Sequence, residues 1–212
     1  MDKEDLEEQI KDVYTLYDLL AKGIAINEGT ILKASIILML YNIIESTITN
    51  CLIIIHMEME SYSFDELNIS LQKFLSSYML NKVDKLEKKS FHKFKSDYEN
   101  LDFKIPSYQE LTQYETIISG NIDGRKINEI FKCYNIDYLK CKEKKNLLKI
   151  KNLRNKLAHG NISFKHAGRN ITPNELIDLI NSTNITLNEV IVNVSTYIDN
   201  KKFVKANNQI SI

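Results

Sequence analysis

Three polar residues stand close together in the stretch KNLRNKLAHG, which covers residues 151 to 160. Arg154 is followed directly by Asn155, and His159 comes four residues after that asparagine. An arginine guanidinium keeps its charge at physiological pH, and an imidazole titrates near neutrality. This pair suits chemistry on a phosphate ester, in which one group holds the phosphate charge and the other moves a proton.

A helix must carry this stretch, and we expect it to run from about residue 139 to residue 158. Placed at about 100° per residue, Arg154 falls inside an apolar arc of that helix. The helix is rich in lysines, yet its one arginine stands at the edge of the core, where a charge needs a partner or a task. The arc contains Leu147, Ile150, Leu153, Leu157 and Ala158.

On an ideal helix His159 lies about 140° from Arg154, so the two side chains do not share a face. Their convergence requires the helix to end near Ala158, with Gly160 at its C-cap, or a second copy of the motif across a dimer. A purely structural interpretation also exists. In it, the arginine caps carbonyl groups and the histidine stands against the negative end of the helix dipole.

The composition favours helices. The 212 residues include only 6 Gly and 2 Pro, so long helices can form without interruption, and we expect an all-α protein with no sheet. Lys plus Arg and Asp plus Glu both total 28. This balance excludes the global basic field of a general nucleic-acid binder. Basic residues nevertheless cluster over residues 140 to 156, either as a solvated helix face or as part of the site.

The cysteines and the N-terminus bear on cofactors and location. Cys51, Cys133 and Cys141 have no metal-ligand spacing, and their odd number argues against a disulfide framework. We expect no metal site and no cofactor. The N-terminal residues are acidic and contain no apolar signal region. We therefore expect a cytoplasmic protein with reduced thiols.

The most apolar segment covers residues 31 to 57 and follows an amphipathic helix over residues 3 to 21. It is long enough to span a membrane, but polar residues such as Lys33 and Asn42 are spread along it, and charge at a bilayer centre is costly. We interpret it as a core helix and expect no membrane association. Glu45 stands among its apolar residues, either as a satisfied core carboxylate or as the partner of an active-site group; a pair with Arg154 would serve both.

Further helices are expected over residues 64 to 85, over residues 124 to 134 and from residue 173 onward. The last is predicted by Thr172 as the N-cap, followed by Pro173 and Glu175. Residues 160 to 171 are expected to be a loop. Residues 86 to 122 look like a partly helical insertion whose lysines and aromatics suit either contacts with single-stranded RNA or coverage of the core. One domain is expected over residues 1 to 204, with a frayed tail over residues 205 to 212.

The residues from Arg154 to His159 resemble the motif of HEPN-domain proteins, which has an arginine, four to six further residues and a histidine, often with asparagine after the arginine. The resemblance is to a HEPN-like nuclease subfamily of prokaryotic conflict systems. It extends to the final helix and to Tyr41-Asn42, Ile44-Glu45-Ser46, Gly120-Asn121-Ile122-Asp123, Ser163-Phe164 and Gly168-Arg169.

The resemblance implies a HEPN-type bundle of long antiparallel helices that forms a homodimer with one composite active site. Many members are metal-independent endoribonucleases that act as toxins or as abortive-infection effectors against phage. On this basis His159 is the general base or acid for attack of a ribose 2′-hydroxyl on the adjacent phosphate, and Arg154 stabilises the charge on the phosphoryl oxygens. Asn155 orients a phosphate or the histidine, and Glu45 holds the arginine.

Further expectations concern the substrate and the partners. Lys151 and Lys156, on the helix of the motif, and Ser163 and Arg169, after it, are predicted to bind the RNA. An antitoxin or a sister HEPN subunit is a further candidate partner. Some HEPN proteins keep the fold and only bind. The alternative function is therefore a non-catalytic module for a partner protein or a nucleotide, and a third is a purely structural dimerisation protein.

Overall fold

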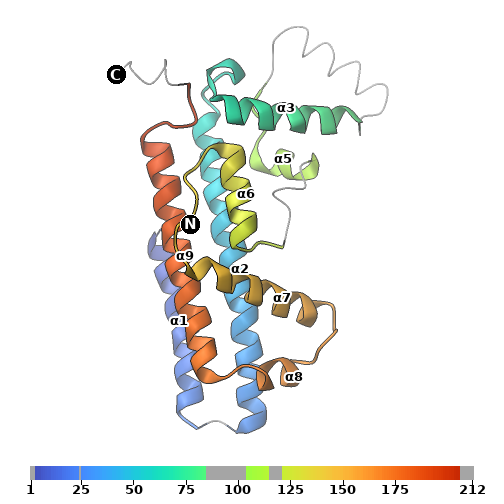
Figure 1. Ribbon diagram of the computed structural model, residues 1–212, viewed down its shortest axis with the longest axis vertical. Coiled ribbons are helices and arrows are strands. Elements are labelled where there is room, and N and C mark those ends of the chain that lie inside the picture. Colours follow the sequence, from blue (N-terminus) through green and yellow to red (C-terminus); the bar gives the residue numbers. More distant parts are fainter. Residues whose placement is uncertain (1–2, 24, 85–103, 115–120, 206–212) are drawn as a thin grey trace. The chain divides into compact units, whose positions relative to one another are not determined.

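The computed structural model describes residues 3–23, 25–84, 104–114 and 121–205. In these residues the chain forms helices, together with one isolated β-bridge between Leu67 and Val204 (Figure 1). The prediction of an all-α protein is confirmed. The elements are α1 (Lys3–Ala21), α2 (Ile26–Met59), the 3-10 helix η1 (Phe64–Glu66), α3 (Ile69–Asp84), α5 (Tyr108–Tyr114), α6 (Gly124–Tyr134), the 3-10 helix η2 (Glu143–Lys145), α7 (Asn146–Ala158), α8 (Phe164–Arg169) and α9 (Pro173–Asp199).

The chain forms two compact units. The first consists of Met1–Asn50, Gly120–Ile127 and Leu139–Val192. The second consists of Cys51–Ser119, Asn128–Tyr138 and Asn193–Ile212. The helices α2, α6 and α9 contribute residues to both units. One domain over residues 1 to 204 stays a prediction.

The first unit is built on three long helical segments: α1, residues 26–50 of α2 and residues 173–192 of α9 (Figure 1). The hydroxyl of Tyr14 donates to Asn181 Oδ1 at 2.5 Å, and the hydroxyl of Tyr17 donates to the carbonyl of Pro173 at 3.3 Å. Since the residue number rises along α1 while it falls along α9, these two helices are antiparallel. Their apolar faces are buried, including Leu6, Ile10, Val13, Ile37, Leu40, Ile44, Leu176, Ile180 and Leu187.

The helix α2 is longer than the predicted segment of residues 31 to 57. By length and composition it could cross a membrane, but 56% of its most apolar window is buried inside the protein. One of the charges that argued against a membrane span also has a structural partner, because Lys33 Nζ donates to the carbonyl of Ile171 at 2.6 Å. These contacts favour the interpretation of α2 as a core helix.

The helix α7 begins at Asn146, so the predicted start near residue 139 was wrong. The 3-10 helix η2 (Glu143–Lys145) precedes it. Before η2, Glu189 accepts hydrogen bonds from the backbone N–H groups of Lys140, at 2.6 Å, and Cys141, at 3.0 Å. These residues are therefore bound to a distant part of the chain and are not in the helix. The predicted end at Ala158 is confirmed.

The segment between α7 and α9 was predicted as a loop, but Phe164–Arg169 forms the helix α8. Ser163 is its N-cap, since its hydroxyl accepts from the N–H of His166 at 3.2 Å. Helix α8 lies against α2 so closely that a Cβ on Gly168 would be 1.8 Å from the carbonyl oxygen of Thr30. The predicted start of α9 is confirmed, because the N–H of Glu175 donates to Thr172 Oγ1 at 3.2 Å.

The second unit contains η1, α3 and α5, with residues from α2, α6 and α9. The single helix predicted over residues 64 to 85 is divided into η1 and α3, and Asn68 lies between them as a cap that accepts from the N–H of Leu71 at 2.9 Å. The core of this second unit includes Leu71, Leu75, Tyr78, Leu111, Phe131, Tyr134, Tyr197 and Phe203. Most of the predicted insertion, namely residues 86–103 and 115–120, lies outside the described residues, as do residues 206–212 of the predicted tail.

Candidate active site

The side chain of Arg154 projects from α7 onto one face of α2. Its guanidinium carbon is 4.1 Å from the centroid of the Tyr41 ring, and its Nη2 is 3.7 Å from Glu45 Oε2. Tyr41 and Glu45 are four residues apart on α2, one turn of the helix, so they share that face. The Nη1 of Arg154 also donates to Asn155 Oδ1 at 3.0 Å. The contact between Arg154 and Glu45 that the sequence predicts is therefore present.

Glu45 is more exposed than predicted. Its side chain is 37% exposed, and that of Arg154 is 28% exposed, so the pair lies at the surface of the unit and not among apolar side chains. A separation of 3.7 Å is also longer than a hydrogen bond. Glu45 therefore contributes attraction without occupying an N–H of the guanidinium. Among the described residues, the arginine has one hydrogen-bond partner, and its other donors can meet a phosphate.

The turn at residues 121–123 contacts this site through each of its residues. The Nδ2 of Asn155 donates to Asn121 Oδ1 at 2.7 Å. The N–H of Ile122 donates to the hydroxyl of Tyr41 at 3.2 Å. Lys151 Nζ donates to Asp123 Oδ2 at 2.5 Å. The turn is thus bound both to α2, through Tyr41, and to α7, the helix that carries Arg154.

Asp123 is buried and has several donors. Its Oδ1 accepts from the N–H groups of Arg125 and Lys126, which caps the start of α6. Burial alone would raise the pKa of this carboxyl, but the hydrogen bonds from Lys151, Lys126 and Arg125 outweigh that effect and hold the pKa below its ordinary value. Asp123 is therefore ionised at neutral pH, and its pair with Lys151, whose side chain is 16% exposed, fixes the first turns of α7.

Tyr41 is fully buried under the guanidinium. Burial raises the pKa of its hydroxyl, although the Ile122 N–H acts in the opposite direction. Tyr41 is thus a neutral phenol at physiological pH. A neutral ring attracts the guanidinium through its π face without neutralising the charge that a phosphate would need.

His159 is the C-cap of α7, and its side chain is exposed. The next residue, Gly160, has φ of +68°. Its N–H donates to the carbonyl of Leu157 at 3.1 Å, and the N–H of Asn161 donates to that of Lys156 at 2.9 Å. This pair of hydrogen bonds is a Schellman motif, and it ends the helix where the sequence predicts an end from the glycine. The imidazole makes no hydrogen bond or ion pair with a described residue, so a single chain does not join it to Arg154.

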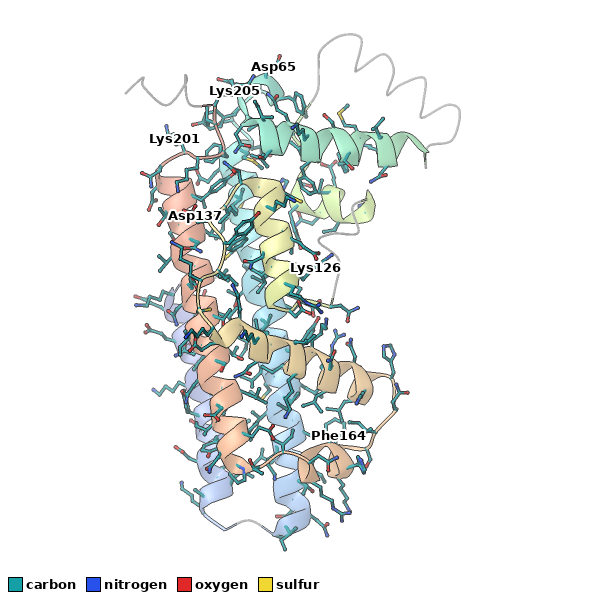
Figure 2. All side chains as sticks on the ribbon, viewed as in Figure 1. Asp65, Lys126, Asp137, Phe164, Lys201 and Lys205 are labelled. Carbon is teal, nitrogen blue, oxygen red and sulfur yellow. The ribbon has the colours of Figure 1, made fainter. Side chains whose placement is uncertain are left out.

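The predicted substrate-binding residues have different environments. Lys156 is exposed in the last turn of α7, and Arg169 is exposed on α8. Lys151 is held by Asp123, and the hydroxyl of Ser163 caps α8. Figure 2 shows α7 between the first turn of α6, which carries Lys126, and α8, which begins at Phe164. Contacts of all four predicted residues with RNA stay predictions.

Two contributors were not assigned a role from the sequence. The π contact of Tyr41 could have been predicted. Tyr41 and Glu45 are four residues apart on one helix, so a side chain that pairs with Glu45 also lies near the Tyr41 ring. Asn121 belongs to a turn signal, but nothing in the sequence shows which side chain it meets. In the part of the chain that the structure describes, no group of three His, Cys, Asp or Glu side chains is arranged to hold a metal ion.

Comparison with known proteins gives a match to one family model. A family model described as HEPN_MAE_28990-like HEPN matches residues 3–203 of the chain. No curated protein and no solved structure matches the chain. The match covers nearly the whole sequence, including α2, the turn at residues 121–123 and the Arg154 to His159 segment. The chain therefore belongs to the HEPN family.

Proposed function

We propose that this HEPN protein is an endoribonuclease that cuts RNA without a metal ion and acts as a toxin or abortive-infection effector. The observation that carries the proposal is the environment of Arg154. The guanidinium is fixed by Tyr41, Glu45 and Asn155, yet most of its donors are unoccupied by described residues. A fixed cation with free donors suits the charge that builds on a phosphoryl group during transfer.

In the proposed reaction, His159 takes the proton of a ribose 2′-hydroxyl. The 2′-oxygen forms a bond to the adjacent phosphorus, and the bond from phosphorus to the 5′-oxygen breaks. That leaving oxygen receives a proton from a second acid, for which the His159 of another copy is the candidate. The products are a 2′,3′-cyclic phosphate and a 5′-hydroxyl. Arg154 stabilises the negative charge of the pentacoordinate phosphoryl group.

The proposal requires two copies of the chain. In one copy the exposed imidazole of His159 makes no hydrogen bond or ion pair with a described residue, so a homodimer that brings the motifs together would complete the site. Lys156 and Arg169 are exposed near the end of α7 and on α8, where they could hold the RNA backbone.

The direct test uses purified protein and single-stranded RNA in the presence of EDTA. We expect cleavage that leaves cyclic phosphate ends, and a loss of at least 100-fold in rate for His159→Ala. The matched control is His166→Ala, which removes an exposed histidine outside the motif and should keep the wild-type rate. Expression of the three proteins in a bacterial host should show toxicity for the wild type and His166→Ala only.

Several results would overturn the proposal. One is a folded protein that cleaves no class of RNA, alone or with a genomic neighbour added. Another is equal cleavage by wild type and His159→Ala. A strict monomer in light scattering at the concentration of the cleavage assay would contradict the composite site.

One observation favours the alternative, a non-catalytic module that binds a partner protein or a nucleotide. No described residue orients the ring of His159, whereas a general base is usually held by a third group. Under this alternative, His159→Ala would leave the cellular phenotype intact, and substitutions that disrupt the helical surface would remove it.

A further inference from the structure

We propose that Asn121 is a positioning residue for Arg154, acting through the side-chain amide of Asn155. The inference rests on the proposed ribonuclease function for its catalytic consequence. Its structural basis is a chain of two hydrogen bonds: Asn155 Nδ2 donates to Asn121 Oδ1 at 2.7 Å, and Arg154 Nη1 donates to Asn155 Oδ1 at 3.0 Å.

The direction of the Asn155 amide is the first step. An asparagine amide has a donor end and an acceptor end, and Arg154 can only donate. The guanidinium therefore needs the oxygen of Asn155, and the nitrogen must then face an acceptor. Asn121 Oδ1 is that acceptor. Without it, the Asn155 amide is held only by its hydrogen bond from Arg154, and its side chain is less restricted.

The backbone of Asn121 is the second step. Its φ is +54°, in the left-handed region that asparagine and glycine adopt more readily than other residues. Asn121→Gly therefore removes the amide and keeps the backbone conformation. The turn retains its other two anchors, the Ile122 N–H to Tyr41 and the Asp123 pair with Lys151. The variant tests positioning separately from folding.

The chain offers a matched control. Asn135 is also exposed and has φ of +63°, so Asn135→Gly is the same chemical change in the same backbone conformation. Asn135 belongs to the other compact unit. A conservative variant, Asn121→Asp, keeps an acceptor oxygen for Asn155 and also tolerates a left-handed backbone.

The experiment measures RNA cleavage and the NMR signals of the arginine side chains in protein labelled with 13C- and 15N-arginine. The chain has three arginines, so the Arg154 signal can be assigned by comparison with Arg125→Lys and Arg169→Lys. We expect Asn121→Gly to lower kcat by about 10-fold to 100-fold with less than about a 3-fold change in KM. It should also shift or broaden the Arg154 guanidinium signal. Asn135→Gly should change neither the cleavage kinetics nor the Arg154 signal. Asn121→Asp should give the Arg154 signal of the wild type.

The outcomes separate this inference from the proposed function. If the wild type cuts RNA and Asn121→Gly matches Asn135→Gly in kcat and in the Arg154 signal, the positioning role is overturned while the ribonuclease stands. If the wild type cuts no RNA but Asn121→Gly alone shifts the Arg154 signal, the positioning role stands and the ribonuclease is overturned.

Discussion

The guanidinium of Arg154 lies over the ring of the fully buried Tyr41, with 4.1 Å between the guanidinium carbon and the ring centroid. A bidentate pair with a carboxylate would occupy two N–H donors and cancel the charge. The ring occupies no N–H donor and does not cancel the charge. The carboxylate oxygen Oε2 of Glu45 is 3.7 Å from Arg154 Nη2. The site therefore holds its arginine in place while leaving most of its N–H donors unoccupied by described residues.

Tyr41 provides a test of this relationship through two substitutions. Tyr41→Phe keeps the ring but leaves the buried N–H of Ile122 without its acceptor, which should lower the free energy of unfolding by about 1–3 kcal/mol. Tyr41→Leu also removes the ring, so we expect about a 10-fold further loss in RNA cleavage rate. Urea unfolding and cleavage kinetics measure the two effects. Equal cleavage rates in the two folded variants would contradict the role of the ring.

Gly160 fixes the place where α7 ends, directly after His159. Its φ of +68° is strained for residues with a Cβ, and a Cβ there would meet no atom within 4 Å. Gly160→Ala should therefore lower the free energy of unfolding by about 1–2 kcal/mol through backbone strain alone. It should also lower cleavage, since the chain would leave the helix differently at the histidine. Gly160→Asn, which tolerates this conformation, should stay close to wild type, and equal stability of the two variants would argue against the Schellman geometry.

Gly168 allows α8 to lie against the backbone of α2. A Cβ at this position would be 1.8 Å from the carbonyl oxygen of Thr30, so Gly168→Ala forces the two helices apart. We expect a loss of about 1–3 kcal/mol in urea unfolding, the usual cost of overpacking. Gly29→Ala is the control. Its Cβ would make an ordinary contact with Leu20 at 3.6 Å, and a helical alanine should stabilise the protein by about 0.5–1 kcal/mol. A neutral Gly168→Ala would contradict the close approach.

The sequence predicts those parts of the site that depend on local rules. Helix periodicity places Arg154 toward α2, where it meets Glu45, and Gly160 predicts the helix end. The sequence could not predict the contact just before α7, in which the carboxylate of Glu189, 49 positions from Lys140, accepts from the backbone, because local rules do not show long-range partners. Helix α8 has only 6 residues, too few for periodicity to show, and its stability depends on contact with α2.

The second unit contains a histidine that the motif does not include. His56 is buried, and its Nδ1 donates to the carbonyl of Pro106 at 2.7 Å. Its Nε2 is then the acceptor for the hydroxyl of Tyr134, at 2.8 Å. Burial lowers the pKa of this imidazole from 6.5 to about 4, although the hydrogen bond to Pro106 acts in the opposite direction. The folded protein therefore holds His56 neutral.

Stability should consequently fall on mild acidification. Between pH 6.5 and about 4 the unfolded chain binds a proton at His56 that the folded chain does not, so this contribution is complete above 6.5 and is lost as the pH falls. From pH 7 to pH 5 we expect a loss of about 2 kcal/mol from this group in urea unfolding. His56→Gln cannot take up the proton, so it should be less stable at pH 7 but lose about 2 kcal/mol less over the same interval. The wild-type pH dependence in His56→Gln would show that the pKa of His56 is the same in the folded and unfolded states.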